Sequence, residues 1–83
     1  MLTSVYRSKN KDHMYLYITT KDDFSEVPEK LMKLFGKPEF SMLVNLSKRQ
    51  KLARVELPLV KQALKEQGYY LQMPPVIHEN KAN

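Results

Sequence analysis

The run Met14-Tyr15-Leu16-Tyr17-Ile18 constrains the fold of this chain more than any other feature of the sequence. Successive side chains of a β-strand point to opposite faces, so one face carries Met14, Leu16 and Ile18 and the other carries two tyrosines. A strand with one face in water carries polar residues on that face. The run therefore predicts a strand in the interior of its sheet, with packed layers on both faces.

Apolar spacing and the positions of proline and glycine predict six elements. They are strands over residues 2–7, 14–19, 40–46 and 69–73, and helices over about 25–35 and 56–67, with a further short helical turn after residue 47. Connections through helices usually return the chain parallel, whereas the first two strands form a hairpin. We therefore expect a small single-domain α/β sandwich of the α/β/α type, around a mixed sheet of about four strands in the order β-β-α-β-α-β.

Particular residues are expected to set the helix ends and the buried faces. Ser25 suits the N-cap of the first helix, and Pro28 suits its first turn. Gly36 and Gly68 follow the two helices and are expected to have positive φ. The residues expected to face the core are Val27, Leu31, Leu34 and Phe35 in the first helix and Leu57, Val60, Ala63 and Leu64 in the second helix. In the third strand, one face is expected to carry Phe40, Met42, Val44 and Leu46.

Length and composition exclude several classes of protein. With 83 residues the chain is expected to form one domain over residues 1–75, followed by a flexible tail over 76–83. It has no cysteine, which excludes a disulfide scaffold, a zinc ribbon and a thiol nucleophile. Its two glycines stand alone, so no glycine-rich phosphate loop is present, and His13 and His78 lack ligand partners at metal-site spacing. We expect no cofactor and no metal.

The stretch 48–54 carries four positive charges and no negative one, on Lys48, Arg49, Lys51 and Arg54. We call these four residues the basic patch. They form either a solvated surface or a site for an acidic partner such as nucleic acid. Aromatic strand residues near basic ones can hold nucleic-acid bases by stacking, although the same residues are suited to core packing. The candidates for stacking are Tyr6, Tyr15, Tyr17 and Tyr69.

The N-terminal residues lack the apolar stretch of a secretory signal. The longest unbroken apolar run is also much shorter than the ~20 residues that a membrane-spanning helix needs. We therefore expect a cytoplasmic protein that does not enter a membrane, and a monomer is favoured.

Several runs resemble the YcgL family of small bacterial proteins. They include residues 14–18, Asp22-Asp23-Phe24-Ser25 and Leu34-Phe35-Gly36-Lys37-Pro38. The run from Val60 to Gln72, followed by two prolines, continues the resemblance, which covers about residues 1–75. This resemblance implies a small α/β sandwich fold, and it brings no established activity, cofactor or catalytic residue.

Three functions are compatible with the sequence. The first is a non-enzymatic module that recognises another macromolecule, because no ligand cluster, glycine-rich loop or activated nucleophile is recognisable. The alternative is weak nucleic-acid binding through the basic patch, helped by Arg7, Lys9 and Lys11. The third is a small enzyme, which a pocket lined by tyrosines of the first two strands beside a carboxylate would favour.

Overall fold

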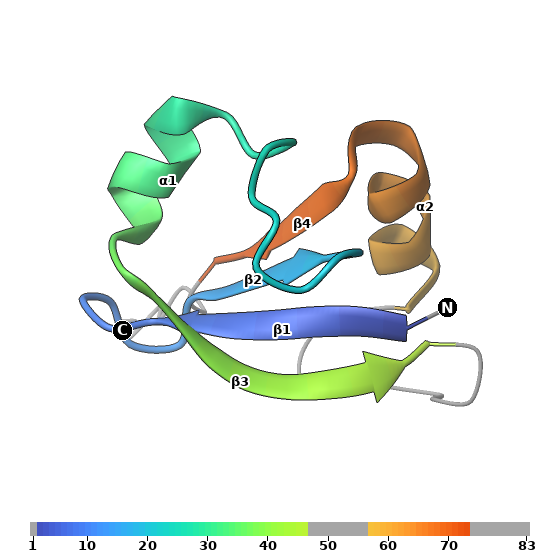
Figure 1. Ribbon diagram of the computed structural model, residues 1–83, viewed down its shortest axis with the longest axis horizontal. Coiled ribbons are helices and arrows are strands. Elements are labelled where there is room, and N and C mark those ends of the chain that lie inside the picture. The colour runs from blue at the N-terminus through green and yellow to red at the C-terminus, as the bar shows by residue number, and fades with distance from the viewer. Residues whose placement is uncertain (1, 47–56, 74–83) are drawn as a thin grey trace, which may run out of the picture.

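The computed structural model describes residues 2–46 and 57–73, and these form four strands and two helices (Figure 1). In chain order the elements are β1 (Leu2–Ser8), β2 (Tyr15–Ile18), α1 (Glu29–Phe35), β3 (Pro38–Asn45), α2 (Leu57–Gln67) and β4 (Tyr69–Gln72). This order confirms the predicted succession of elements and the α/β class. The short helical turn expected after residue 47, the basic patch and the tail expected over 76–83 lie outside the described residues.

The four strands form one sheet in the order β3-β1-β2-β4, and every neighbouring pair is antiparallel. The mixed sheet expected from the sequence is therefore wrong. The connection through α1 does return the chain in the direction of β2, but β1 lies between β2 and β3. The connection that contains α2 then leads from one edge of the sheet to the other, where β4 runs antiparallel to β2.

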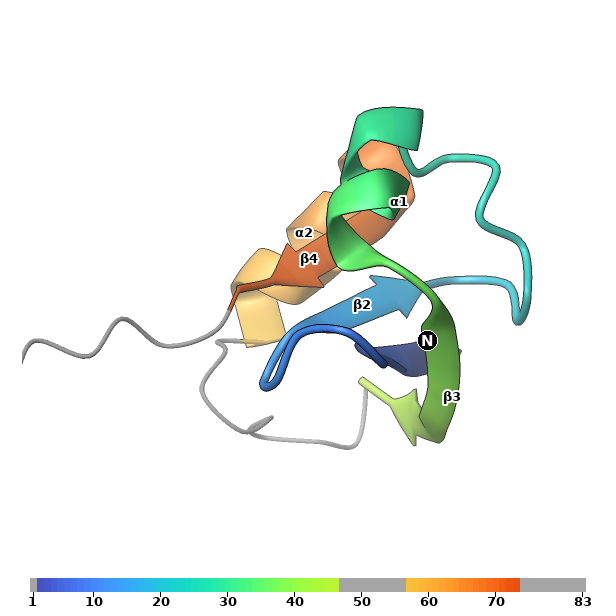
Figure 2. The ribbon, with the colours of Figure 1, turned by 90° about the vertical axis from the view of Figure 1, so that its left-hand side faces the viewer.

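β2 lies in the interior of the sheet and is covered on both faces, as its sequence predicts. Leu16 and Ile18 belong to a buried cluster with Val27 and Phe35 of the α1 side. Tyr17, on the opposite face, belongs to a second cluster with Leu57, Val60 and Leu64 of α2. The two helices thus cover opposite faces of the sheet, and β4 passes between them (Figure 2).

α1 begins later than the sequence indicates. Its N-cap is Pro28, and Ser25 does not cap it. The Ser25 hydroxyl instead donates to Asp23 Oδ1 at 2.6 Å, and the Ser25 N–H donates to the same oxygen at 3.1 Å. Leu34 was expected in the core but is exposed, because Phe35 anchors this seven-residue helix and the inward positions fall at Leu31 and Met32.

A β-bulge in β3 explains why one strand face was predicted wrongly. The pairing of β1 with β3 shifts between Val5 and Tyr6, so that Met42 lies opposite Val5 and Phe40 lies opposite Tyr6. Val5 and Tyr6 point to opposite faces, and the extra residue therefore separates Phe40 from Met42 and Val44. Val44 and Leu46 are buried on the α2 side, whereas the Phe40 ring packs edge-on against Tyr6 on the other side.

Both helices end at a glycine with positive φ, as predicted. Gly36 has φ 82° and Gly68 has φ 88°. A side chain rarely adopts this backbone conformation, which glycine reaches without a steric penalty. The two glycines allow the chain to leave each helix and enter β3 and β4.

Candidate ligand-binding site

The four tyrosines that the sequence offers for base stacking differ in burial. Tyr6 and Tyr17 are only 2% and 3% exposed, so their rings offer little surface to a ligand. Tyr15 and Tyr69 are half-buried and retain some accessible surface. Base stacking on any of them stays a prediction, and so does nucleic-acid binding by the basic patch.

Tyr6 anchors the turn that follows β2. Its hydroxyl donates to Asp22 Oδ1 at 2.8 Å and accepts from the Asp22 N–H at 2.7 Å. Burial, followed by the hydrogen bond to the Asp22 carboxylate, raises the pKa of Tyr6 above its ordinary value. Asp22 has φ 65°, and the two hydrogen bonds hold it in this uncommon conformation.

Tyr17 joins β2 to β4 through its side chain. The hydroxyl donates to Gln72 Oε1 at 2.8 Å, and the ring packs edge-on against Tyr70. Burial raises the pKa of Tyr17 to about 12, and the neighbouring Tyr70 and Tyr15 act in the same direction. These contacts assign Tyr17 to the α2 side of the core.

An open cavity of about 480 Å³ lies at the end of the β1–β2 hairpin. Its lining combines two cations, two carboxylates, a histidine and a tyrosine ring. The lining residues are Arg7, Ser8, Lys9, Asp12, His13, Tyr15 and Glu39. We call this the hairpin cavity. A pocket with a tyrosine of the first two strands beside a carboxylate is the feature that would favour the third function, a small enzyme. Tyr15 lies in this cavity with Asp12 and Glu39.

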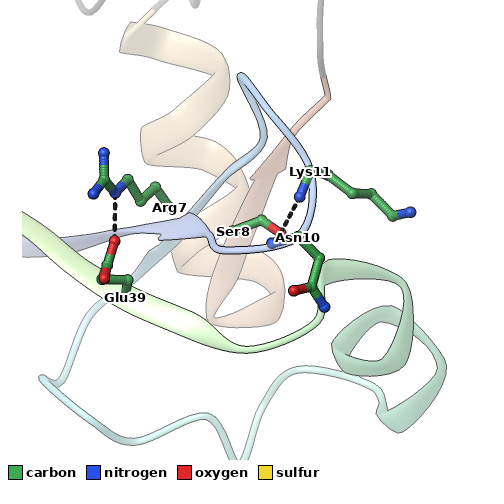
Figure 3. Close-up of polar contacts among 5 residues, drawn as sticks. All are labelled: Arg7, Ser8, Asn10, Lys11 and Glu39. Carbon is green, nitrogen blue, oxygen red and sulfur yellow. Dashed lines mark hydrogen bonds and ion pairs between the residues drawn. The ribbon is translucent and has the colours of Figure 1, made fainter.

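Ser8 organises the loop that forms one wall of the hairpin cavity. Its Oγ accepts from the N–H groups of Asn10 and Lys11 at 3.1 and 3.0 Å (Figure 3). The same hydroxyl donates to the carbonyl oxygen of Phe35. The Lys9 N–H donates to the Lys37 carbonyl at 3.1 Å, which fixes the same loop to the residues after α1. The loop is therefore held to α1 through the Ser8 hydroxyl and to the residues after α1 through a main-chain hydrogen bond, while Lys9 and Lys11 are exposed.

The opposite wall of the hairpin cavity is formed by side chains that strand pairing brings side by side. Arg7 pairs with Tyr15 on β2 and with Glu39 on β3, so the three side chains lie in one row on the α2 side of the sheet. Arg7 Nε donates to Glu39 Oε1 at 2.6 Å (Figure 3). Both side chains of this ion pair retain solvent exposure. The sequence could not place Glu39 at this site, because its position depends on the pairing of β1 with β3.

The geometry of the hairpin cavity suits binding better than nucleophilic catalysis. An activated serine donates its proton to a base, whereas the Ser8 hydroxyl donates to a main-chain carbonyl. Over residues 2–46 and 57–73, no three histidine, aspartate or glutamate side chains are placed to hold a metal ion. The arrangement can present positive charge, carboxylate oxygens and an aromatic ring to one small ligand.

A second exposed feature lies on β3, at the edge of the sheet (Figure 1). Phe40, Met42 and Leu43 are large apolar residues with exposed side chains, and Leu43 is 56% exposed. Lys21 places its Nζ 4.5 Å from the centre of the Phe40 ring. Over residues 38–44 no described strand pairs with the outer side of β3. We call residues 38–44 the β3 edge.

The described helices are also short. None of those in the described part of the chain is long and apolar enough to cross a membrane.

Comparison with known proteins identifies the family. A family model described as the YcgL domain matches residues 3–75. A YcgL domain-containing protein of Proteus mirabilis is 52% identical over 77 residues, which cover 93% of this chain and 79% of that protein. A protein named YcgL from Salmonella arizonae is 57% identical over 75 residues, covering 90% of this chain and 68% of that protein. A protein named YcgL from Salmonella agona is also 57% identical over 75 residues, which cover 90% of this chain and 74% of that protein. The present chain therefore belongs to the YcgL domain family.

Proposed function

We propose that this protein is a non-enzymatic interaction module of the cytoplasm, which binds an extended segment of another protein along the β3 edge. The observation that carries the proposal is the eight-residue edge strand with large apolar side chains exposed. Edge strands usually carry charges or proline that prevent pairing with other chains. In the β3 edge these are confined to its first two residues, Pro38 and Glu39.

The partner segment is expected to be apolar and acidic. An added strand forms main-chain hydrogen bonds with the edge, and its side chains contact the neighbouring side chains of the sheet. The apolar contacts would come from Phe40, Met42 and Leu43, which lie on both faces of β3. The protein has a formal net charge of +5, and Lys21 lies over Phe40, so acidic residues in the segment are favoured.

Partner binding is favoured over pairing with a second copy. The bulge between Phe40 and Met42 lies near the middle of β3 and increases the local twist. If two copies paired through this edge across a two-fold axis, both bulges would lie inside the contact. Each bulge would then interrupt the hydrogen bonds between the two strands. A flexible extended segment can follow the twisted edge, and two copies with a net charge of +5 repel each other.

Photocrosslinking in cells followed by hydrogen exchange tests this proposal. A photoreactive residue at position 43 is compared with one at position 59. Leu59 is similarly exposed but belongs to α2 and not to the β3 edge. The peptide crosslinked only at position 43 is then synthesised and added to the purified protein. We expect exchange of the amides in the β3 edge to slow about tenfold or more. Leu43→Lys should abolish this effect, while Leu59→Lys should leave it unchanged.

Two outcomes would contradict the proposal. One is a crosslinked peptide that leaves the exchange of the β3 edge unchanged. The other is a stable dimer in light scattering that Leu43→Lys dissociates, because the edge would then be occupied by a second copy. A monomer with slowed β3 exchange supports the proposal.

A second candidate function is nucleic-acid binding by the basic patch. Support for it comes from Arg7, Lys9 and Lys11, three further cations that the β1–β2 hairpin gathers at its own end of the sheet. Binding should be micromolar or weaker near physiological salt, as non-specific binding commonly is. For three or four phosphate contacts to a single strand, log K should fall with log salt with a slope of about −2 to −3.

Fluorescence anisotropy with a generic single-stranded oligonucleotide tests this second function. Replacing Arg49 and Lys51 by Ala should remove about two phosphate contacts and flatten the salt slope accordingly. Folding stability should change little, because exposed charges contribute little to it. An absence of binding at about 20 mM salt, or an unchanged slope in the double variant, would exclude the basic patch as the binding site.

A further inference from the structure

The hairpin cavity has the size and the mixed chemistry of a small-ligand site. Its volume of about 480 Å³ falls within the roughly 300–1,000 Å³ of pockets that hold small molecules. Charged and aromatic groups converge on it from β1, β2, β3 and the hairpin loop. A ligand that matches this lining carries an anionic group, hydroxyl groups and a flat ring together.

The cations of the hairpin cavity are available to an anion. Arg7 contacts Glu39 through Nε, and this single contact uses one of the five N–H donors of a guanidinium group (Figure 3). Among the described residues no ion pair is formed by Lys9. An arginine with free donors beside a lysine is the combination that binds phosphate by charge-assisted hydrogen bonds.

The loop that presents Lys9, Asp12 and His13 is held before any ligand binds. Ser8 Oγ and the Lys37 carbonyl accept main-chain hydrogen bonds from three loop residues. His13 has φ 64°, a conformation that residues other than glycine rarely adopt. Such strained residues occur often at ligand sites, where surrounding contacts maintain them. Because the loop is ordered before binding, less conformational entropy is lost when a ligand binds.

We propose that the hairpin cavity binds a ribonucleoside 5′-phosphate, either as a free nucleotide or as the 5′-phosphorylated end of an RNA. Arg7 and Lys9 bind the phosphate. Asp12 and Glu39 accept hydrogen bonds from the ribose hydroxyls, as carboxylates do in dinucleotide sites. Tyr15, held at the wall by its pairing with Arg7, stacks on the base. This site lies at the hairpin, shares only Glu39 with the β3 edge, and does not depend on the basic patch.

Amide chemical shifts of the intact protein, titrated with adenosine 5′-monophosphate, test this proposal. We expect saturable shifts centred on residues 9–15, with a Kd below about 1 mM. Adenosine, which lacks the phosphate, should bind about tenfold more weakly or worse. The 2′-deoxy nucleotide should bind a few-fold more weakly, because one ribose hydroxyl is lost. A 5′-phosphorylated oligoribonucleotide, compared with its 5′-hydroxyl form, distinguishes an RNA end from a free nucleotide.

Matched variants separate binding from folding. Lys9→Ala should weaken nucleotide binding about five- to tenfold, whereas Lys30→Ala, which removes another exposed lysine on α1, should have no effect. Tyr15→Phe keeps the ring and should retain binding, and Tyr15→Leu should lose it while retaining a dispersed spectrum. An absence of saturable shifts with both the nucleotide and the phosphorylated RNA would overturn the proposal. Equal affinity for inorganic phosphate would also overturn it, because base and ribose would then contribute nothing.

Discussion

Leu16 belongs to the cluster on the α1 side and is 1% exposed. Truncation of a core leucine removes its burial free energy and leaves a cavity, so Leu16→Ala should lower the free energy of unfolding by about 2–5 kcal/mol. Urea unfolding of the variant beside the wild type measures this loss. A loss below about 1 kcal/mol would mean that the surrounding side chains close the cavity or that the site is less packed than its burial indicates.

Tyr17 should make stability depend on alkaline pH. Its pKa is about 12 in the folded chain against an ordinary value of 10, so the folded state favours the neutral phenol. The resulting contribution to stability is complete below pH 10 and is lost as the pH rises from about 10 to 12. At neutral pH, Tyr17→Phe should cost about 1–3 kcal/mol, because it leaves the buried Gln72 Oε1 without its hydrogen-bond donor.

Urea unfolding of wild type and Tyr17→Phe at several pH values checks this dependence. The advantage of the wild type over the variant should shrink across the alkaline range. The variant shares every other titratable group with the wild type, so the difference between the two proteins reports on Tyr17 alone. An advantage that stays constant up to pH 12 would contradict a raised pKa for Tyr17.

At the scale of elements, the connection between the β1–β2 hairpin and α1 depends on Ser8. Its hydroxyl oxygen serves two loop N–H groups and the Phe35 carbonyl, and the residue is buried. Ser8→Ala leaves these main-chain groups without their partner, which should cost about 1–3 kcal/mol. Ser41→Ala, at an exposed position of β3, is the matched control and should change stability by less than about 0.5 kcal/mol.

Thermal unfolding of the Ser8 and Ser41 variants gives the comparison. Amide exchange then locates the effect, because the loop at residues 9–13 should exchange faster in Ser8→Ala than in the wild type. Equal stability of the two serine variants would mean that water replaces the Ser8 hydroxyl without cost.

At the scale of the whole molecule, the two buried clusters share β2, since Leu16 and Tyr17 point to its opposite faces. Loss of either cluster exposes the central strand, so the described domain should unfold in one cooperative transition. Leu16→Ala and Leu64→Ala, one in each cluster, should each lower the midpoint of that single transition. Circular dichroism and tyrosine fluorescence should give coincident curves for both variants. Two separate transitions in either variant would show that the clusters unfold independently.

Local patterns in the sequence determined the elements of this protein and the central position of β2. The run Met14–Ile18 is apolar at every position, so burial on both faces follows from the alternation of side chains alone. The glycines after each helix likewise follow from local backbone sterics. Membership of the YcgL family also rests on the sequence, since the matched residues are contiguous from 3 to 75.

Strand pairing decided the sheet direction and the candidate sites. Insertion of β1 between β2 and β3 makes all neighbouring pairs antiparallel, and the bulge in β3 turns Phe40 away from Val44. The hairpin cavity needs Glu39 beside Arg7, two residues 32 positions apart in the chain. Such contacts depend on register between distant segments, which the alternation within a single strand does not encode. The sequence by itself determined the order and type of the elements and the burial of β2 on both faces. Only the tertiary structure decided which strands pair, and with that pairing which face each side chain of β3 takes.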